Sequence, residues 1–195
     1  FKKIIKNRRS SPDEKHNDVL QLFMDCQYKD GSRPTETEIT GMMIALLFAG
    51  QHTSSVTSTW MGLYALRNPE AWKDMKEEQR NIIKKYGDEV TSEALNDMEV
   101  LHSVMKEALR LRPPLVFVIR RVYKDRTYKE YTIPEGDDLF LCTSVSGSLT
   151  DVFENADKFQ HKRFVGDFEK KAPPYAWFGF GGGGHRCRGE QFAYT

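Results

Sequence analysis

A long apolar segment in the first third of the chain constrains the fold most strongly. It is rich in Met, Ile, Leu and Ala, and it extends from about Ile39 to Leu66. Thr35 and Glu38 stand before it with the spacing of a capping box, in which each side chain binds a free backbone amide of the first helical turn. Asn68-Pro69 follows it, and an N-cap with proline at the first helical position is typical of a new helix. The segment therefore predicts one long helix.

Most of the other periodic segments are also typical of helices. Residues 1 to 110 read as helices with short breaks, and the clearest lie near 19–23, 70–86, 92–96 and 99–111. Beyond Pro113-Pro114 the pattern changes to short apolar runs that predict strands at 115–119, 131–133 and 139–141. Strands and helices do not alternate regularly, so a doubly wound nucleotide-binding fold is not expected. We predict a mainly α fold with a few short β-strands.

Composition narrows the class of protein further. The chain has 195 residues, and 29 basic against 28 acidic side chains give a net charge of +1, which disfavours a nucleic-acid partner. Three cysteines are too few for a disulfide scaffold, and no apolar stretch is long enough to cross a bilayer. The chain begins with Phe1, so we expect residues 1–195 to be a single partial domain of a longer protein.

The most specific local feature is the glycine-rich run from Phe180 to Glu190, which contains Cys187. A flexible linker with a chance cysteine is one reading. A phosphate-binding loop is excluded, because His185 and Arg186 stand where a Walker loop needs Lys and Ser or Thr. The remaining reading is a thiolate metal site, and one cysteine is too few for structural zinc or an iron–sulfur cluster. Haem iron needs only one axial thiolate. Cys26 and Cys142 are expected to be ordinary buried residues.

Two weaker signals precede this run. Glu107 and Arg110 lie three residues apart on one helix face, a spacing that usually marks an ordinary solvated pair. The long helix also has a polar interior around Gly50. This stretch is either a buried patch whose hydroxyls bond back to the helix, or a place where Gly50 opens the helix to a ligand or O₂ while His52 and Thr53 relay protons.

Taken together, and in this order, the three signals resemble the cytochrome P-450 superfamily. The family's Phe-x-x-Gly-x-x-x-Cys-x-Gly haem signature matches Phe180, Gly183, Cys187 and Gly189. Its Glu-x-x-Arg pair matches Glu107 and Arg110. Its oxygen-binding motif matches Ala49, Gly50 and Thr53. His52 stands where most members carry an acid, and Gly50-Gln51-His52-Thr53-Ser54 is similar to the sterol 14α-demethylase branch. So are Tyr28-Lys29-Asp30-Gly31 and Tyr131-Thr132-Ile133-Pro134.

The resemblance implies a cytochrome P-450 fold, of which this chain is the C-terminal part with the long central helix, the Glu-x-x-Arg helix and the haem-binding Cys loop. Cys187 would be the axial thiolate of haem b, and His185 and Arg120 would contact its propionates. Glu107 and Arg110 would form a buried structural pair completed by Arg163. The haem would also meet Phe180, Gly181, Gly183, Gly189, Ala49 and Gly50. His52 and Thr53 would be the catalytic residues of the proton path.

The resemblance also implies a substrate and partners. Ala45, Leu115, Phe117 and Ile119 would form part of an apolar wall against a sterol. A demethylase of this branch removes the 14α-methyl group in three O₂-dependent oxidations, with electrons from NADPH through a reductase. It is held in the endoplasmic reticulum membrane by an N-terminal anchor. The alternatives are a related haem-thiolate enzyme acting on another lipid or xenobiotic, and a degenerate non-catalytic haem-binding homologue.

Four positions depart from the branch pattern. Gly184 stands where Arg is usual, Arg188 where an apolar residue is usual, and Gly179 and His161 where Pro is usual.

Overall fold

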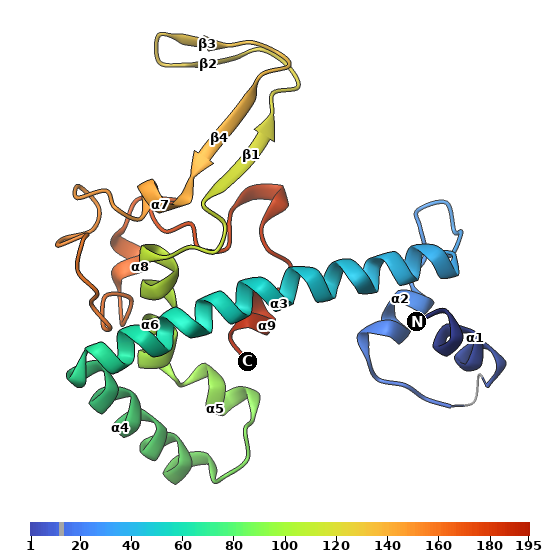
Figure 1. Cartoon of the computed structure of the whole chain (residues 1–195), viewed down its shortest axis with the longest axis horizontal. Coiled ribbons are helices and arrows are strands. Elements are labelled where there is room, and N and C mark those ends of the chain that lie inside the picture. Colours follow the sequence, from blue (N-terminus) through green and yellow to red (C-terminus); the bar gives the residue numbers. More distant parts are fainter. Residues whose placement is uncertain (12–13) are drawn as a thin grey trace. The chain divides into compact units, whose positions relative to one another are not determined.

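The computed structural model describes residues 1–11 and 14–195, without the side chain of residue 169, and this part of the chain is mainly helical (Figure 1). Its longer helices are α1 (Lys2–Ser10), α2 (Val19–Asp25), α3 (Glu36–Arg67), α4 (Pro69–Tyr86), α5 (Ser92–Asn96) and α6 (Glu99–Leu111). Single turns follow at α7 (Thr143–Ser146), α8 (Phe168–Lys171), the 3-10 turn η1 (Gly183–His185) and α9 (Glu190–Ala193). The predicted fold class is confirmed.

The capping box at the start of α3 has both of its reciprocal bonds. The Thr35 backbone N–H donates to Glu38 Oε2 at 2.7 Å, and the Glu38 N–H donates to Thr35 Oγ1 at 3.3 Å. The Thr35 N–H and the Thr35 hydroxyl, which donates to the same oxygen at 2.7 Å, hold the pKa of Glu38 below its ordinary value. The structure therefore confirms the predicted start of the long helix.

Asn68 occupies the N-cap position of α4, with Pro69 at the first helical position as predicted. Its side chain does not cap α4, however. The Asn68 amide instead donates to the Tyr64 carbonyl at 2.6 Å and so satisfies an acceptor at the end of α3. The tight junction between the two helices explains this choice, because the same residue ends one helix and begins the next.

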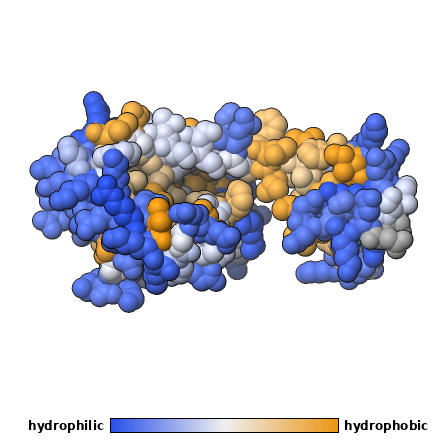
Figure 2. Space-filling view, turned by 90° about the horizontal axis from the view of Figure 1, so that it is seen from below, coloured by the Kyte–Doolittle hydropathy of each residue, from blue (hydrophilic) through white to orange (hydrophobic). Residues whose placement is uncertain are grey.

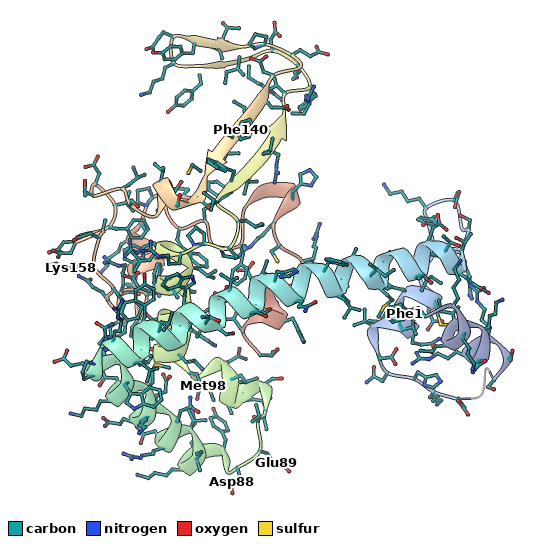
Figure 3. All side chains as sticks on the ribbon, viewed as in Figure 1. Phe1, Asp88, Glu89, Met98, Phe140 and Lys158 are labelled. Atoms are coloured by element: carbon teal, nitrogen blue, oxygen red, sulfur yellow. The ribbon has the colours of Figure 1, made fainter. Side chains whose placement is uncertain are left out.

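The chain divides into two compact units, Phe1–His52 and Thr53–Thr195. The core of the first unit contains Ile5, Leu20, Met24 and Ile39, contributed by α1, α2 and the start of α3. The described residues of the second unit include a cluster between α4 and the α5–α6 region, around Ile82, Ala94 and Met98. Another lies in the loops after α7, around Phe153, Ala156 and Phe164. Figure 3 labels Met98 between α5 and α6.

The strands form two small antiparallel ribbons within the second unit. β1 (Phe117–Arg121) pairs with β4 (Asp138–Cys142), and β2 (Arg126–Tyr128) pairs with β3 (Tyr131–Ile133). The β2–β3 hairpin extends from the far end of the β1–β4 ribbon (Figure 1), and Phe140 lies on that ribbon opposite Ile119 (Figure 3). Three predicted strands are confirmed. β2 was not predicted, because Arg-Thr-Tyr has no apolar run.

Two smaller expectations are wrong. Cys26 is exposed, because it is the C-cap of α2 and lies beyond the last turn that faces the core; its thiol donates to the Phe23 carbonyl at 3.1 Å. Cys142 is only half-buried. Of the two readings of the stretch around Gly50, the one in which Gly50 opens the helix is not supported, because α3 continues through Gly50 without a break.

The surface seen in Figure 2 is mostly hydrophilic, with hydrophobic residues gathered along part of α3. Those exposed residues include Ile44, Leu46, Leu47 and Phe48. Among the described residues, no helix combines the length and hydrophobicity needed to cross a bilayer.

Candidate functional site

The most buried charges in the described chain form a network around Glu107 on α6. Glu107 is 0% exposed and Arg110 3% exposed, and Arg110 Nε and Nη2 donate to the two Glu107 carboxylate oxygens at 2.7 and 2.8 Å. Arg163 joins from a loop 56 residues later, with Nε 3.1 and 3.0 Å from the same two oxygens. The Gln160 backbone N–H donates to Glu107 Oε1 at 3.0 Å. The structure thus brings together Glu107, Arg110 and Arg163.

Two guanidinium groups meet one carboxylate here, and backbone carbonyls balance the extra positive charge. Arg110 Nη1 donates to the Gly147 and Ala156 carbonyls at 2.6 and 2.7 Å, and Nη2 donates to the Lys158 carbonyl at 3.1 Å. Lys158 is labelled in this loop in Figure 3. A buried ion pair is retained only when its remaining donors and acceptors are satisfied, and this one meets that condition. The network fastens α6 to the segment 147–163 that follows α7.

Gly147 is fitted closely to this network. A Cβ built on Gly147 would overlap the Arg110 carbonyl oxygen and lie 3.0 Å from its Cγ. The backbone after α7 therefore approaches α6 at a distance that only glycine permits. This close approach allows the Gly147 carbonyl to reach the guanidinium.

The N-terminus of α6 is held by a side chain from α4. Glu78 Oε1 accepts from the Val100 N–H at 2.6 Å, and Oε2 accepts from the Leu101 N–H at 2.9 Å. A carboxylate is favourable there because the first amides of a helix lack partners within the helix and carry partial positive charge. Glu78 therefore fixes the end of α6 opposite to the Glu107 network.

The Cys187 loop is closed by its own backbone. The Cys187 N–H donates to the Phe180 carbonyl at 2.9 Å, and Gly181 and Gly183 adopt φ values of +73° and +67°, in the left-handed region that favours glycine. Gly182 lies against the Tyr175 ring, which would have to shift if a Cβ were added 2.8 Å from it. These glycines explain why the run folds as a defined loop and contradict the linker reading.

Haem is the group that the resemblance implies, and the residues of this loop fit it. Cys187 is exposed, and a Cβ at Gly183 or Gly184 would meet no atom within 4 Å. A Cβ at Gly189 would lie 3.9 Å from the Cys187 sulfur, at ordinary contact distance. The described residues contain no cluster of three or more His, Cys, Asp or Glu able to hold a metal ion, whereas haem iron needs only one protein ligand. A single accessible thiol among glycines is the donor set that such a cofactor requires.

The two residues predicted to contact the propionates lie in different settings. His185 is exposed and ends η1, two residues before Cys187. Arg120 is half-buried on β1, where its Nη1 donates to the Ile119 carbonyl at 2.8 Å. Their contact with a cofactor stays a prediction.

The predicted oxygen-side residues lie on α3. Ala45, Ala49 and Thr53 are four residues apart and so share one helix face. Thr53 is half-buried and belongs to the second unit, whereas Ala45, Ala49, Gly50 and His52 are exposed and belong to the first. Of these residues, only Thr53 therefore belongs to the same unit as the Cys187 loop. Their catalytic and cofactor roles stay predictions.

The predicted substrate wall is built on β1. Phe117 and Ile119 alternate with Val118 and Arg120 along the strand, so the two apolar side chains project on one face. Both are about half exposed, at 55% and 52%, and Leu115 just before the strand is 61% exposed. The Phe117 ring contacts the Phe140 ring of β4 edge-on, with centroids 6.1 Å apart. This face is apolar and accessible, as a wall for a rigid lipid would have to be.

The structure accounts for two of the four departures from the branch pattern. His161 Nε2 lies 2.9 Å from Asp74 Oδ2 on α4, and Lys162 Nζ lies 2.6 Å from the same oxygen. The Lys162 and His161 bonds lower the pKa of Asp74 to about 2. A Cβ on Gly179 would overlap the Trp177 indole. Gly184 and Arg188 are exposed, and nothing in the structure explains them.

Several residues that organise this site were missed by sequence reasoning. Glu78 and Gly147 act through contacts 22 and 37 residues away in sequence, which no local pattern reveals. Trp177 donates from Nε1 to the Lys106 carbonyl of α6 at 3.1 Å. Among these residues, only Trp177 could have been noticed in the sequence, because it lies three residues before Phe180 of the haem signature.

Comparison with known proteins gives one consistent result. The family model described as "Cytochrome P450" matches residues 1–195. The chain is 42% identical to obtusifoliol 14-alpha demethylase from Triticum aestivum, 43% to sterol 14-demethylase from Arabidopsis thaliana and 39% to lanosterol 14-alpha demethylase from Homo sapiens. All of the chain is covered, but only 44%, 41% and 38% of these relatives' lengths.

A solved structure, the retinoic acid bound cyanobacterial CYP120A1, matches 98% of this chain and 44% of its own, with a TM-score of 0.89 and 27% identity. The agreement of the family match, the relatives and the fold leads to one conclusion: the chain belongs to the cytochrome P450 family.

Proposed function

We propose that this chain carries the haem-binding part of a haem-thiolate monooxygenase that removes the 14α-methyl group of a sterol precursor. The accessible thiol of Cys187, in a closed glycine loop next to α6, is the observation that carries the proposal. The names of the relatives, all sterol 14-demethylases, support the reaction. Because the chain spans less than half of their length, the activity of the whole protein remains part of this proposal.

Haem b would supply the activation of O₂ when bound. Cys187 would be its ligand, with Phe180, Gly181, Gly183, Gly189, Ala49 and Gly50 against the ring and His185 and Arg120 on the propionates. The Glu107, Arg110 and Arg163 network would keep α6 in place behind the loop. A side chain that carries protons must offer a titratable or hydroxyl group, and His52 and Thr53 would fill this role.

Leu115, Phe117 and Ile119 on the β1 side, and Ala45 on α3, would present apolar surface to the sterol. Such a wall orients a rigid hydrocarbon by shape, with few hydrogen bonds. Electrons would come from NADPH through a reductase. The parent protein would lie at the endoplasmic reticulum membrane, held by an anchor outside this sequence.

A second candidate is a haem-thiolate enzyme acting on another lipid. The matched CYP120A1 structure favours this candidate, because it has retinoic acid bound and the same fold, with a TM-score of 0.89 at 27% identity. Both candidates require Cys187 as the iron ligand. They differ in the molecule held against the β1 face.

Spectral titration of the intact haem-loaded protein separates the two candidates. Obtusifoliol, lanosterol and retinoic acid would each be added while the Soret band is recorded, and formate would be measured with NADPH and reductase present. We expect a Soret shift with a sterol and one formate for each sterol demethylated. A response to retinoic acid without any response to the sterols would favour the second candidate. Failure to retain haem would support the degenerate homologue.

A further inference from the structure

A cation of α6 lies between two aromatic rings at the two ends of the Cys187 loop. Trp177 stands before the loop and Tyr194 stands after it. Lys106 Nζ lies 5.7 Å from the centroid of the Trp177 ring and 5.8 Å from that of Tyr194. Both distances are within the range of a cation–π attraction. One side chain thus contacts the chain on each side of the loop.

The Trp177 end of the loop is held tightly. Its indole Nε1 donates to the Lys106 carbonyl at 3.1 Å, and its ring meets Phe164 and Phe180 edge-on, with centroids 5.8 and 5.9 Å apart. The ring also fills the space that a side chain at Gly179 would need. The indole therefore has one position, fixed by a hydrogen bond and by packing.

The Tyr194 end is held on the same face of α6. The His102 ring meets the Tyr194 ring edge-on at 4.9 Å, and His102 and Lys106 are four residues apart, so they share a helix face. Burial, reinforced by the Lys106 charge, lowers the pKa of His102, which favours the neutral ring against Tyr194. Tyr194 also contacts Phe180, with centroids 5.7 Å apart.

We infer that Lys106, Trp177 and Tyr194 form a clamp that holds the two ends of the Cys187 loop on α6 and so keeps the thiol in the position needed by the iron. Lys106 is a positioning residue in this arrangement, since it acts on Cys187 through the rings. A loop with four consecutive glycines has many alternative conformations when its ends are free. The clamp rests on the proposed function only for the identity of Cys187 as iron ligand.

The test compares Lys106→Met with Lys106→Arg in the intact haem-loaded protein. The reduced carbon monoxide complex would be held in dilute urea, below the unfolding transition, while the red-shifted Soret band of thiolate ligation is followed. Lys106→Met removes the cation of the clamp, and the Soret band should therefore decay roughly three- to tenfold faster than in the wild type. Lys106→Arg should decay at nearly the wild-type rate, because a guanidinium also stacks on aromatic rings.

Lys76 provides a matched control. Its Nζ lies 5.0 Å from the Trp72 ring centroid on α4, so Lys76→Met removes the same kind of contact away from the loop. We expect its decay rate to equal that of the wild type. In a double-mutant cycle, Lys106→Met and Tyr194→Leu should be non-additive, since each breaks the same contact.

The outcomes separate the clamp from the proposed function. A wild-type protein without the thiolate-type Soret band would contradict the proposed function itself. A wild-type band combined with equal decay rates for Lys106→Met and Lys76→Met would overturn the clamp alone. The clamp would also be overturned if Lys106→Met lost the band only at the urea concentration that unfolds the whole protein.

Discussion

Glu107 and Asp138 each bind an arginine through two nitrogen–oxygen pairs, but only Glu107 is buried. Arg121 Nε and Nη2 donate to Asp138 at 2.7 and 3.0 Å, which nearly repeats the geometry of Arg110 on Glu107. The Asp138 side chain is 39% exposed and the Glu107 side chain 0%. At the residue scale, the two carboxylates therefore differ in burial and in the number of partners, since Glu107 also binds Arg163 and the Gln160 N–H.

We predict that Glu107→Gln lowers the free energy of unfolding by about 3–5 kcal/mol, because it leaves two buried guanidinium groups without a counter-charge. Asp138→Asn should change it little, since water solvates the exposed arginine. Urea denaturation of both variants measures the difference. Equal losses would contradict the assignment of Glu107 as a buried structural anchor.

Asp74 gives a pH-dependent prediction at the same scale. Bonds from Lys162 and His161 lower its pKa to about 2 from an ordinary value of 3.8. Since the folded pKa is depressed, this stabilisation is fully present above the ordinary value and is lost as the pH falls through about 2. Asp74→Asn should therefore lose less stability than the wild type between pH 5 and pH 2.5.

The measurement is the free energy of unfolding from urea titrations at the two pH values. Asp88→Asn is the control, because Asp88 is exposed in the turn after α4 (Figure 3). It should lose as much stability as the wild type. If Asp74→Asn loses as much stability as this control between the two pH values, the bonds of Asp74 to His161 and Lys162 do not contribute to acid stability.

At the scale of elements, α6 depends on the close approach of the backbone after α7. Gly147→Ala would force a Cβ into the Arg110 carbonyl, and we expect a loss of about 1–3 kcal/mol, typical of overpacking. Gly62 on α3 is the matched control, since a Cβ there meets no atom within 4 Å. Gly62→Ala should be neutral or stabilise by up to about 1 kcal/mol. Thermal unfolding of both variants checks the difference, and equal behaviour would contradict the close approach.

Glu78 makes a second prediction for α6. Removing its carboxylate by Glu78→Ala should cost about 1 kcal/mol, the usual effect of losing a helix cap. The neighbouring Glu77 is exposed, and Glu77→Ala should change the stability much less. Hydrogen exchange would localise the effect, because the Val100 and Leu101 amides should exchange faster only in Glu78→Ala.

The sequence predicted the elements well and the contacts between them poorly. The bounds of α4, α5 and α6 were predictable because Pro69, the amphipathic spacing and Pro113 act locally. The Glu107–Arg110 spacing alone indicated a solvated pair; its burial depends on Arg163, Gly147 and the loops around them, all distant in sequence. Only the family resemblance suggested Arg163.

At the scale of the whole molecule, the charge network, the Glu78 cap and the Cys187 loop all converge on α6 within the second unit. Glycine positions explain why the loop can close, which composition alone did not reveal: Gly181 and Gly183 need positive φ, and Gly182 lies against Tyr175. The oxygen-side residues of α3 were predicted through the resemblance, and their roles stay predictions.

The ligation of haem iron by Cys187 can be tested with the reduced carbon monoxide spectrum of the intact protein. We expect the red-shifted Soret band of thiolate ligation in the wild type and in Cys26→Ser and Cys142→Ser, since those two thiols lie outside the loop. Cys187→His should lose that band even where it retains haem. A Cys187→His protein that kept the red-shifted band would show that Cys187 is not the iron ligand.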